Sequence, residues 1–436
     1  MEVVIDEIKI ERYPVYKESG VEWLGEIPEH WKTLSNKYIF KIKKNEVGKK
    51  ASQYTLLSLT LNGIIKRDME NPQGKFPAEF NTYQEVKKDD FIFCLFDVEE
   101  TPRTVGLSPY DGMITGAYTV MEVVKDLDKT FLYYFYLNLD KGKRMRPLYR
   151  GLRNTIPKES FFTFKTFIPP LNEQTAVAEF LDVKTAQIDR VIAQKEKLIE
   201  HLKVRRQLLI DKSVTQGVTL DVELKDSGVK WLSQIPKHWE VVKSKRLFFE
   251  RKERCRDTDE QLTASQKHGV IYQKHYMELE NRRVTQVEFN RNILKHIEPG
   301  DFVISMRSFQ GGIEYCEFEG CVSSAYIVLT PTKKVVPIFF KYLLKSSPYI
   351  KALSSTSNLV RDGQALRFEN FSLVDLFVIP EEEQILIATF IEQVIGKTDR
   401  AVSLQEKEIG KLKEYKATLI NAAVTGKIKV TLLCHI

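Results

Sequence analysis

Residues 19–31 read SGVEWLGEIPEHW, and residues 227–239 read SGVKWLSQIPKHW. Nine of the thirteen positions are identical at an offset of 208 residues, and they include both tryptophans, the histidine and the Ile-Pro pair. Self-similarity at a fixed offset is the sequence signature of a repeated structural unit. The chain is therefore predicted to contain two copies of one module.

Further short matches follow in the same order in both halves of the chain. They pair Asp90-Phe91-Ile92-Phe93 with Asp301-Phe302-Val303-Ile304, Ile168-Pro169 with Ile379-Pro380, and Glu173-Gln174 with Glu383-Gln384. Between these matches the two halves differ greatly. Neutral drift after duplication would also erode the matches, so the pattern favours two modules that do the same job on different targets.

A long helix is predicted after each module. Residues 172–216 contain no proline or glycine, and Pro169 and Pro170 stand just before them. Apolar side chains recur there with a seven-residue period, and residues 382–425 carry the same register. We favour antiparallel pairing of the two helices over packing of each helix on its own module. The predicted pairing residues are Leu181, Ile188, Leu202, Leu209, Ile391, Leu412 and Leu419.

The predicted fold class is α/β (mixed α+β). Two similar globular modules are separated by two long helices that form an antiparallel coiled coil, with pseudo-twofold symmetry. In the modules, short runs rich in aromatic and β-branched residues alternate with helical stretches between turn signals. The predicted division is module 1 at 1–170, a first helix at 171–217, module 2 at 218–380 and a second helix at 381–428.

The basic residues are clustered. The 436-residue chain has 66 Lys plus Arg and 59 Asp plus Glu, a net charge of +7. Residues 141–165 contain eight Lys or Arg and one acidic residue, and residues 243–256 contain seven against two. Lys and Arg neutralise phosphates, while Arg, Asn and Gln bond to base edges. One basic run is more often a solvated face, but its recurrence in both modules favours DNA binding.

Composition also bears on location and on metal binding. No apolar run approaches the roughly 20 residues needed to cross a bilayer, and the N-terminal segment MEVVIDEIKIERYP is acidic where a secretory signal is basic. We therefore expect a cytoplasmic protein with reduced cysteines. Cys316 and Cys321 are separated by four residues, but no second pair and no His-x₃₋₅-His accompany them. We interpret them as buried free thiols rather than zinc ligands.

The sequence lacks the signatures of catalysis. No phosphate-binding loop of the form G-x-x-x-x-G-K-[ST] is present. Glu85-Val86-Lys87 and Glu223-Leu224-Lys225 have the carboxylate-x-lysine spacing of magnesium nucleases, but no second carboxylate supports either one. His30 and His238 are interpreted as structural. We therefore predict no catalytic residue and no metal ligand in this chain.

The order module–helix–module–helix resembles the specificity subunit of type I restriction–modification enzymes. The resemblance rests on Trp23-Leu24-Gly25-x-Ile27-Pro28-x-His30-Trp31, on its copy at residues 231–239, and on Ile168-Pro169-Pro170-Leu171-x-Glu173-Gln174. One departure is Ile379-Pro380-Glu381-Glu382-Glu383-Gln384, which is one residue shorter and acidic.

This resemblance implies a non-catalytic subunit. Each module would be a target recognition domain that reads one half of a bipartite site in double-stranded DNA. The helices would set the gap between half-sites and dock two methyltransferase subunits, which restriction subunits join. S-adenosylmethionine, ATP and magnesium would belong to those partners, and no membrane would be involved.

Polar residues beside the shared matches are the predicted DNA contacts. They are Arg103, Arg150, Arg153 and Asn154 in module 1, and Arg307, Ser308, Gln310, Arg361 and Gln364 in module 2. Two other classes of protein stay open. Tight specific DNA binding without a partner would favour a stand-alone regulator, and magnesium-dependent cleavage lost on Glu223→Ala would favour a nuclease.

Overall fold

The computed structural model describes residues 11–68, 80–219, 221–284, 291–305, 308–356 and 366–430. The chain divides into two compact units. Unit 1 comprises residues 1–195 and 407–436, and unit 2 comprises residues 196–406. Each unit therefore contains one module together with a part of both long helices.

Module 1 is built from short strands and two helices around an aromatic core. The core contains the aromatic rings of Phe40, Phe93, Tyr136 and Phe161. Their ring centroids are at most 6.0 Å apart in the contacting pairs, and most of these pairs pack edge to face. The elements are β1 Tyr16–Glu18, β2 Glu26–Pro28, β3 Lys32–Ser35, β4 Phe40–Ile42, β5 Leu57–Thr60, β6 Gly63–Lys66, β7 Gln84–Val86, β8 Phe91–Phe93, β9 Val105–Leu107, β10 Gly112–Ile114, β11 Thr119–Val123, α1 Lys129–Lys141, α2 Lys158–Thr163 and β12 Lys165–Ile168.

Module 2 repeats this construction, with Phe248 at the centre of a ring of buried aromatics formed by Phe302, Phe340 and Phe371. Its elements are β13 Leu224–Val229, β14 Leu232–Pro236, β15 Glu240–Val242, β16 Phe248–Glu250, β17 Leu262–Ser265, β18 Gly269–Tyr272, α4 Gln273–Glu280, β19 Lys295–Ile297, β20 Phe302–Ile304, α5 Ser308–Gly311, β21 Glu314–Tyr315, β22 Gly320–Val322, β23 Ile327–Pro331, α6 Pro337–Leu343, α7 Ser347–Ser354, α8 Phe368–Ser372 and β24 Leu376–Val378.

The sheets of the two modules correspond one to one. Among the described residues, the four-stranded sheet has the order β4-β11-β8-β9 in module 1 and β16-β23-β20-β21 in module 2. The two-stranded sheets match as well: β1-β2 with β13-β14, β3-β12 with β15-β24, β5-β6 with β17-β18, and β7-β10 with β19-β22. The duplication read from short sequence matches therefore extends to the strand order of the sheets.

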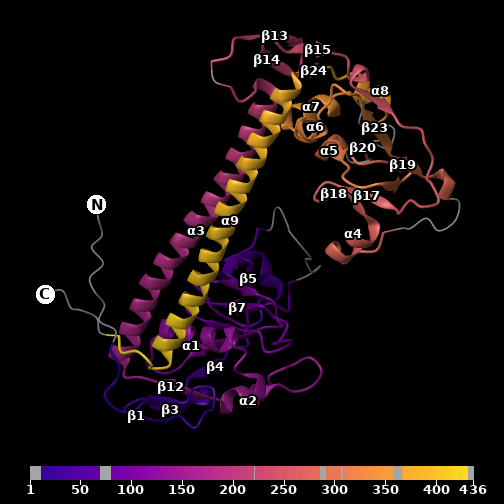
Figure 1. Ribbon diagram of the computed structural model, residues 1–436. Coiled ribbons are helices and arrows are strands. Elements are labelled where there is room, and N and C mark those ends of the chain that lie inside the picture. Colours follow the sequence, from indigo (N-terminus) through magenta and orange to yellow (C-terminus); the bar gives the residue numbers. More distant parts are fainter. Residues whose placement is uncertain are drawn as a thin grey trace. The chain divides into compact units, whose positions relative to one another are not determined.

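The long helices are α3 Leu171–Gln216 and α9 Glu381–Val424, which lie side by side within each unit (Figure 1). Each begins after a proline and has glutamate in its first turn, which suits the positive end of the helix dipole. Glycines with φ of +78° and +71°, Gly217 and Gly426, follow the two helices, as is common where a helix ends.

Charged pairs join the two helices within each unit, and in unit 1 they show that the helices run antiparallel. In unit 1, Lys416 Nζ lies 2.6 Å from Asp189 Oδ2, and Lys195 pairs with Glu408. In unit 2, Arg206 Nη1 lies 2.6 Å from Asp399 Oδ1. As the residue number increases along α3, the residue number of the partner on α9 decreases. The mixed α/β fold with two similar modules and paired long helices is thus confirmed.

The predicted pairing residues are placed as follows. Leu181, Ile188, Ile391 and Leu419 are at most 8% exposed, and Leu202, Leu209 and Leu412 are half-buried. The seven-residue period also predicts a second inward row on α3 that includes Val177, Val191 and Leu198. Val177 is fully buried, but Val191 and Leu198 are exposed, and Ile192 and Ile199 face inward instead. The reason is that α3 carries apolar residues on both flanks of the first row, so the pattern alone did not choose between them.

Candidate nucleic-acid interface

The repeated sequence motif joins each module to the first turn of a long helix. In unit 1, His30 Nε2 lies 2.7 Å from Glu173 Oε1, and the buried Trp31 donates from Nε1 to Glu173 Oε2 at 3.4 Å. In unit 2, His238 Nε2 lies 2.8 Å from Glu383 Oε2, and Trp239 Nε1 donates to the same carboxylate at 3.2 Å. Each of the two histidines thus contacts a carboxylate in the first turn of a long helix.

The glutamine that follows each glutamate fixes the module from the other side. Gln174 is 1% exposed, accepts from the backbone N–H of Asp128 at 2.9 Å and donates to the carbonyl of Pro169 at 2.9 Å. Gln384 does the same with Val336 and Ile379, at 2.8 and 2.9 Å. Asp128 and Val336 are the N-caps of α1 and α6. A buried amide with both ends bonded permits one orientation of the module on its helix.

The far end of the other long helix completes each junction. A Cβ on Gly426, after α9, would lie 2.4 Å from Pro28 Cδ and 3.2 Å from the Trp31 ring. A Cβ on Gly217, after α3, would lie 3.3 Å from Glu383 Oε1 and 3.7 Å from the Trp239 ring. Close approach therefore accounts for glycine at both positions, in addition to their positive φ angles.

Three predicted DNA contacts of module 1 lie together in one hairpin. Two backbone hydrogen bonds between Arg150 and Thr155, of 2.8 and 3.1 Å, close the hairpin. Gly151 and Asn154 have positive φ angles, which turn the chain at its tip. Leu152 stands fully exposed at this tip, and the sequence reading did not single it out. The hairpin therefore presents a cation, an amide and an apolar side chain on one short loop.

An acidic segment holds part of this hairpin. Arg153 donates from Nε to Asp97 Oδ1 at 3.0 Å and from Nη2 to Asp97 Oδ2 at 2.5 Å, and Asn154 Nδ2 donates to Glu100 Oε1 at 3.2 Å. The hydrogen bonds from Arg153 lower the pKa of Asp97 below its usual range. A phosphate would have to compete with Asp97 for Arg153. Arg150, by contrast, is exposed and donates to the carbonyls of Pro147 and Tyr149.

Comparisons with known proteins agree with this construction. No family model matches the chain. The MjaX specificity subunit of a type I restriction enzyme from Methanocaldococcus jannaschii is 22% identical over 442 residues, which cover 95% of this chain and 98% of that protein. The MjaVIII specificity subunit from the same organism is 24% identical over 70% of this chain and 72% of its own length.

Solved structures show the same fold. The HsdS subunit from Thermoanaerobacter tengcongensis aligns over 92% of this chain and 98% of its own, with a TM-score of 0.52 and 14% identity. A chain from a type I restriction–modification system aligns over 91% and 98%, with a TM-score of 0.62 and 13% identity. The chain therefore shares the fold of these two structures. Among its described residues, none of the helices is long and apolar enough to span a membrane.

The other predicted DNA contacts differ in accessibility. Arg103 is largely buried and donates to the carbonyl of Leu61 at 2.8 Å and to the hydroxyl of Tyr133 at 3.3 Å. Ser308 is 1% exposed, and its hydroxyl accepts from the N–H of Ser305 at 2.8 Å. Gln310 is exposed on α5. Three further predicted contacts lie outside the described residues: Arg307, Arg361 and Gln364.

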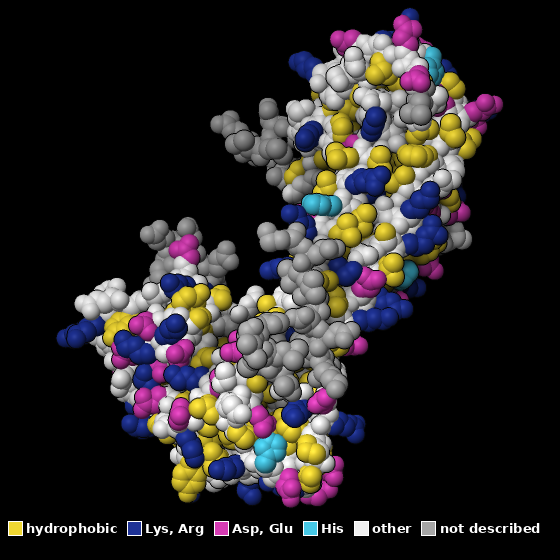
Figure 2. Space-filling view, turned by 90° about the vertical axis from the view of Figure 1, so that its left-hand side faces the viewer, with side chains coloured by type: hydrophobic (Ala, Val, Ile, Leu, Met, Phe, Trp, Pro, Cys, Tyr) yellow, Lys and Arg dark blue, Asp and Glu magenta, His cyan; other side chains and the backbone are white. Residues whose placement is uncertain are grey.

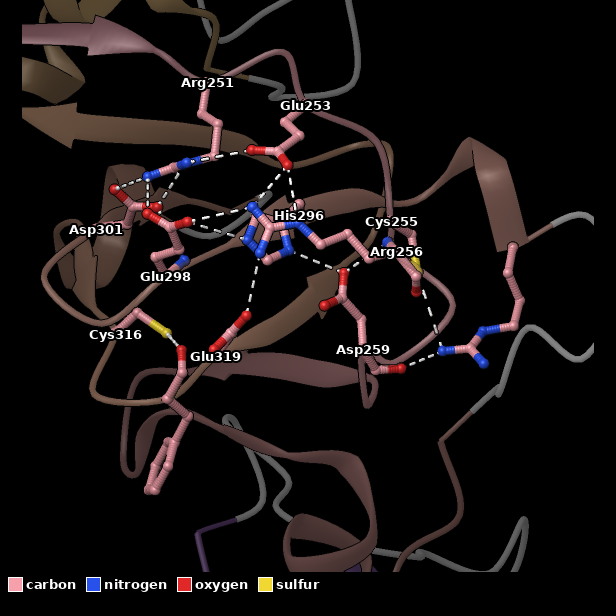
Figure 3. A network of polar contacts seen from close by, with 12 residues as sticks. Arg251, Glu253, Cys255, Arg256, Asp259, His296, Glu298, Asp301, Cys316 and Glu319 are labelled. Carbon is pink, nitrogen blue, oxygen red and sulfur yellow. Dashed lines mark hydrogen bonds and ion pairs between the residues drawn. The ribbon is translucent and has the colours of Figure 1, made fainter.

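Some basic residues of the run at 243–256 form a network of ion pairs (Figure 3), and others are exposed on the surface. Arg251 bonds to Asp301 and Glu298 at 2.8 Å each, and Arg256 bonds to Glu253 at 2.7 Å. These carboxylates neutralise both guanidinium groups, so a count of basic residues overstates the charge that DNA would meet. The exposed basic side chains of this run also include Lys245, Arg246, Lys252 and Arg254.

Positive and negative side chains are interspersed on the face of the molecule shown in Figure 2. On the face drawn in Figure 2, lysine and arginine side chains lie among hydrophobic and acidic ones rather than in one continuous basic surface. On this face the net charge of +7 is therefore not gathered into one basic surface, and particular loops such as the Arg150–Thr155 hairpin are the better candidates for contact with DNA.

Proposed function

We propose that this chain is the DNA-reading subunit of a type I restriction–modification complex, in which each module reads one half of a bipartite site in double-stranded DNA. The observation that carries the proposal is one topology, present twice, with different loops on it and with the same His-Trp and Glu-Gln junction to the long helices. A common scaffold with different loops suits two readers of different sequences. The site is therefore expected to be asymmetric.

The proposal includes two methyltransferase subunits as partners, with restriction subunits joining them. Apolar side chains that no neighbour covers support a docking role for the helices. The exposed fractions on α3 range from 39% to 63% for Val183, Val191, Leu198, Val204 and Leu208.

Unit 2 also has a groove of about 960 Å³ between α3 and module 2, lined by Leu208, Trp231 and Leu373 among others. In unit 1, the guanidinium of Arg144 lies 4.7 Å from the Trp23 ring and donates to Asn421 at 2.7 Å. Trp23 and Trp231 are equivalent in the repeat. In unit 1 the side chain of Arg144 therefore covers Trp23, whereas in unit 2 the equivalent Trp231 lines an open groove. We expect the two docking surfaces to differ in this respect.

We place the chemistry in the partners: S-adenosylmethionine, ATP and magnesium would be bound there, and the complex would act in the cytoplasm, on cellular DNA. The nuclease alternative has little support. Glu85 pairs with Lys87 at 2.9 Å and Glu223 with Lys237 at 2.9 Å, and neither glutamate belongs to a group among the described residues that could hold a metal. Tight specific binding by the chain alone would instead favour the stand-alone regulator.

Selection of duplexes from a random library by the purified complex of this chain with its methyltransferase subunits tests the proposal. We expect two enriched sequence blocks whose centres are about one helical turn, or 10 base pairs, apart. Arg150→Ala is expected to relax one block, at a cost of about 1–3 kcal/mol per lost base contact, and to leave the other block intact. Arg190→Ala, an exposed arginine on α3, is the matched control and should change neither block. A single continuous block would contradict the proposal.

A further inference from the structure

Five potential metal-binding side chains of module 2 form two overlapping groups of three, and Figure 3 shows four of them: Cys255, Asp259, His296 and Glu319. One ligand atom each from Cys255, Asp259 and Cys321 lies within 4.8 Å of the other two, and the same holds for Asp259, His296 and Glu319. Asp259 belongs to both groups. Cys321 and His296 are fully buried, Asp259 is 5% exposed, and Cys255 is half-buried. The two cysteines are 66 positions apart, which is why cysteine spacing gave no sign of the cluster.

The backbone fixes these residues before any ion binds. His296 and Cys321 are directly opposite one another in the antiparallel pair β19–β22, so their side chains share one face of the sheet. Cys321 N–H donates to the carbonyl of Glu260 at 2.9 Å, and Cys255 N–H donates to that of Leu294 at 3.0 Å. Asp259 Oδ2 accepts from the N–H of Arg256 at 2.8 Å. The loop and the strands therefore fix the backbone at these residues, and one site forms when the ring of His296, which already faces Asp259, turns toward the two sulfur atoms.

The chemistry of the donors matches a closed zinc site. Zinc prefers four ligands drawn from cysteine sulfur, histidine nitrogen and carboxylate oxygen. His296 Nδ1 faces Asp259 Oδ2 at 2.9 Å, and its Nε2 lies 3.4 Å from Glu298 Oε1. A metal-binding histidine usually donates its second N–H to a carboxylate, which orients the ring. Glu298 lies where its carboxylate could accept the N–H of His296 Nε2.

The neighbouring charge also fits. Arg291 Nη2 lies 3.9 Å from Cys255 Sγ and donates to the carbonyl of Asp259, while its Nε is buried without a hydrogen-bond partner among the described residues. Two thiolates and one carboxylate around Zn²⁺ carry a net charge of −1. The guanidinium of Arg291 would balance that charge, and the thiolates would be stronger acceptors for it than neutral thiols.

We propose that module 2 binds one zinc ion through Cys255, Cys321, Asp259 and His296. On binding, each of the two thiols loses its proton to solvent as its sulfur forms a bond to zinc, and no electron is transferred. The four protein ligands leave no open position, so the ion is structural. It joins the loop around residues 255–259 to the strands β19 and β22. This proposal is independent of the DNA-reading function proposed above.

Metal analysis of the full-length chain tests the site. The protein is purified with zinc present, passed over a desalting column and analysed by inductively coupled plasma mass spectrometry. We expect about one zinc per chain, and at least about tenfold less in Cys321→Ser and Cys255→Ser. Cys316→Ser is the matched control, because Cys316 is also fully buried in module 2 but its sulfur donates to the carbonyl of Phe318 at 3.1 Å. This variant should retain its zinc.

Cobalt provides a readout on the wild-type protein alone, and a chelator provides a second readout that compares the wild type with one variant. Wild-type protein loaded with Co²⁺ should show a thiolate-to-cobalt charge-transfer band and the intense visible bands of four-coordinate cobalt. A chelator should lower the Tm of the wild type and leave that of Cys255→Ser unchanged. Absence of bound metal, loss of zinc in Cys316→Ser to the same extent, or recovery of a Cys255–Cys321 disulfide from freshly lysed, alkylated cells would each overturn the proposal.

Discussion

Replacing Trp239 by alanine is expected to lower the free energy of unfolding of unit 2 by about 3–5 kcal/mol. The indole is fully buried and lies 4.9 Å from the Phe377 ring, nearly parallel to it. Its Nε1 donates to Glu383, so truncation removes both a large apolar contact and one hydrogen bond of that carboxylate. Because Glu383 stands in the first turn of α9, the loss acts on the joint between module 2 and its helix.

Hydrogen exchange, followed separately for peptides of units 1 and 2, measures this effect. A single melting curve would mix the two units, since large multidomain chains depart from two-state unfolding. Trp239→Ala should reduce protection mainly in unit 2, and Trp31→Ala should reduce it mainly in unit 1, where Trp31 is 1% exposed. A change below about 1 kcal/mol for both variants would mean that the junctions do not hold the modules.

A duplex in which one half-site is scrambled is expected to bind the complex roughly 10²–10⁴-fold more weakly than the intact site. The reason is that each mismatched base pair costs about 1–3 kcal/mol, and separated positions add. Since each module is built on its own complete set of sheets, loss of either half should be costly.

Equilibrium titration at a fixed salt concentration measures the difference, because phosphate contacts make all affinities depend on salt. The matched control is a duplex with the same number of changes placed in the gap between the half-sites, which should bind like the intact site. Equal binding of the intact and half-scrambled duplexes would show that one module alone reads the DNA.

The sequence predicted most of the fold because the features that define it are local or repeated. The Trp23–Trp31 motif and its copy indicated two modules, and the absence of proline and glycine over residues 172–216 indicated a long helix close to the observed Leu171–Gln216. The sequence repeat pairs Glu173 with Glu383. Their contacts with His30 and His238 could not be predicted, because those pairs are more than 140 residues apart in the chain.

The candidate interface was harder to predict, since charge in sequence does not reveal which charges are paired. Arg153 lies in a basic run, yet its guanidinium bonds to Asp97, 56 residues earlier. Ser308 stands beside a shared match, yet it is buried. Leu152 carries no charge and could not be predicted as a contact, although it is fully exposed at the tip of the hairpin. These differences arise from tertiary contacts that neither composition nor periodicity encodes.

Sequencing of methylated bases in cells that carry this gene with its methyltransferase partner tests the central claim most directly. The comparison is with cells that lack this chain but keep the partner. We expect one methylated motif of two unlike blocks separated by a gap of unspecified bases, and we expect it to disappear when this chain is absent. A contiguous motif, or a motif that persists without this chain, would contradict the account.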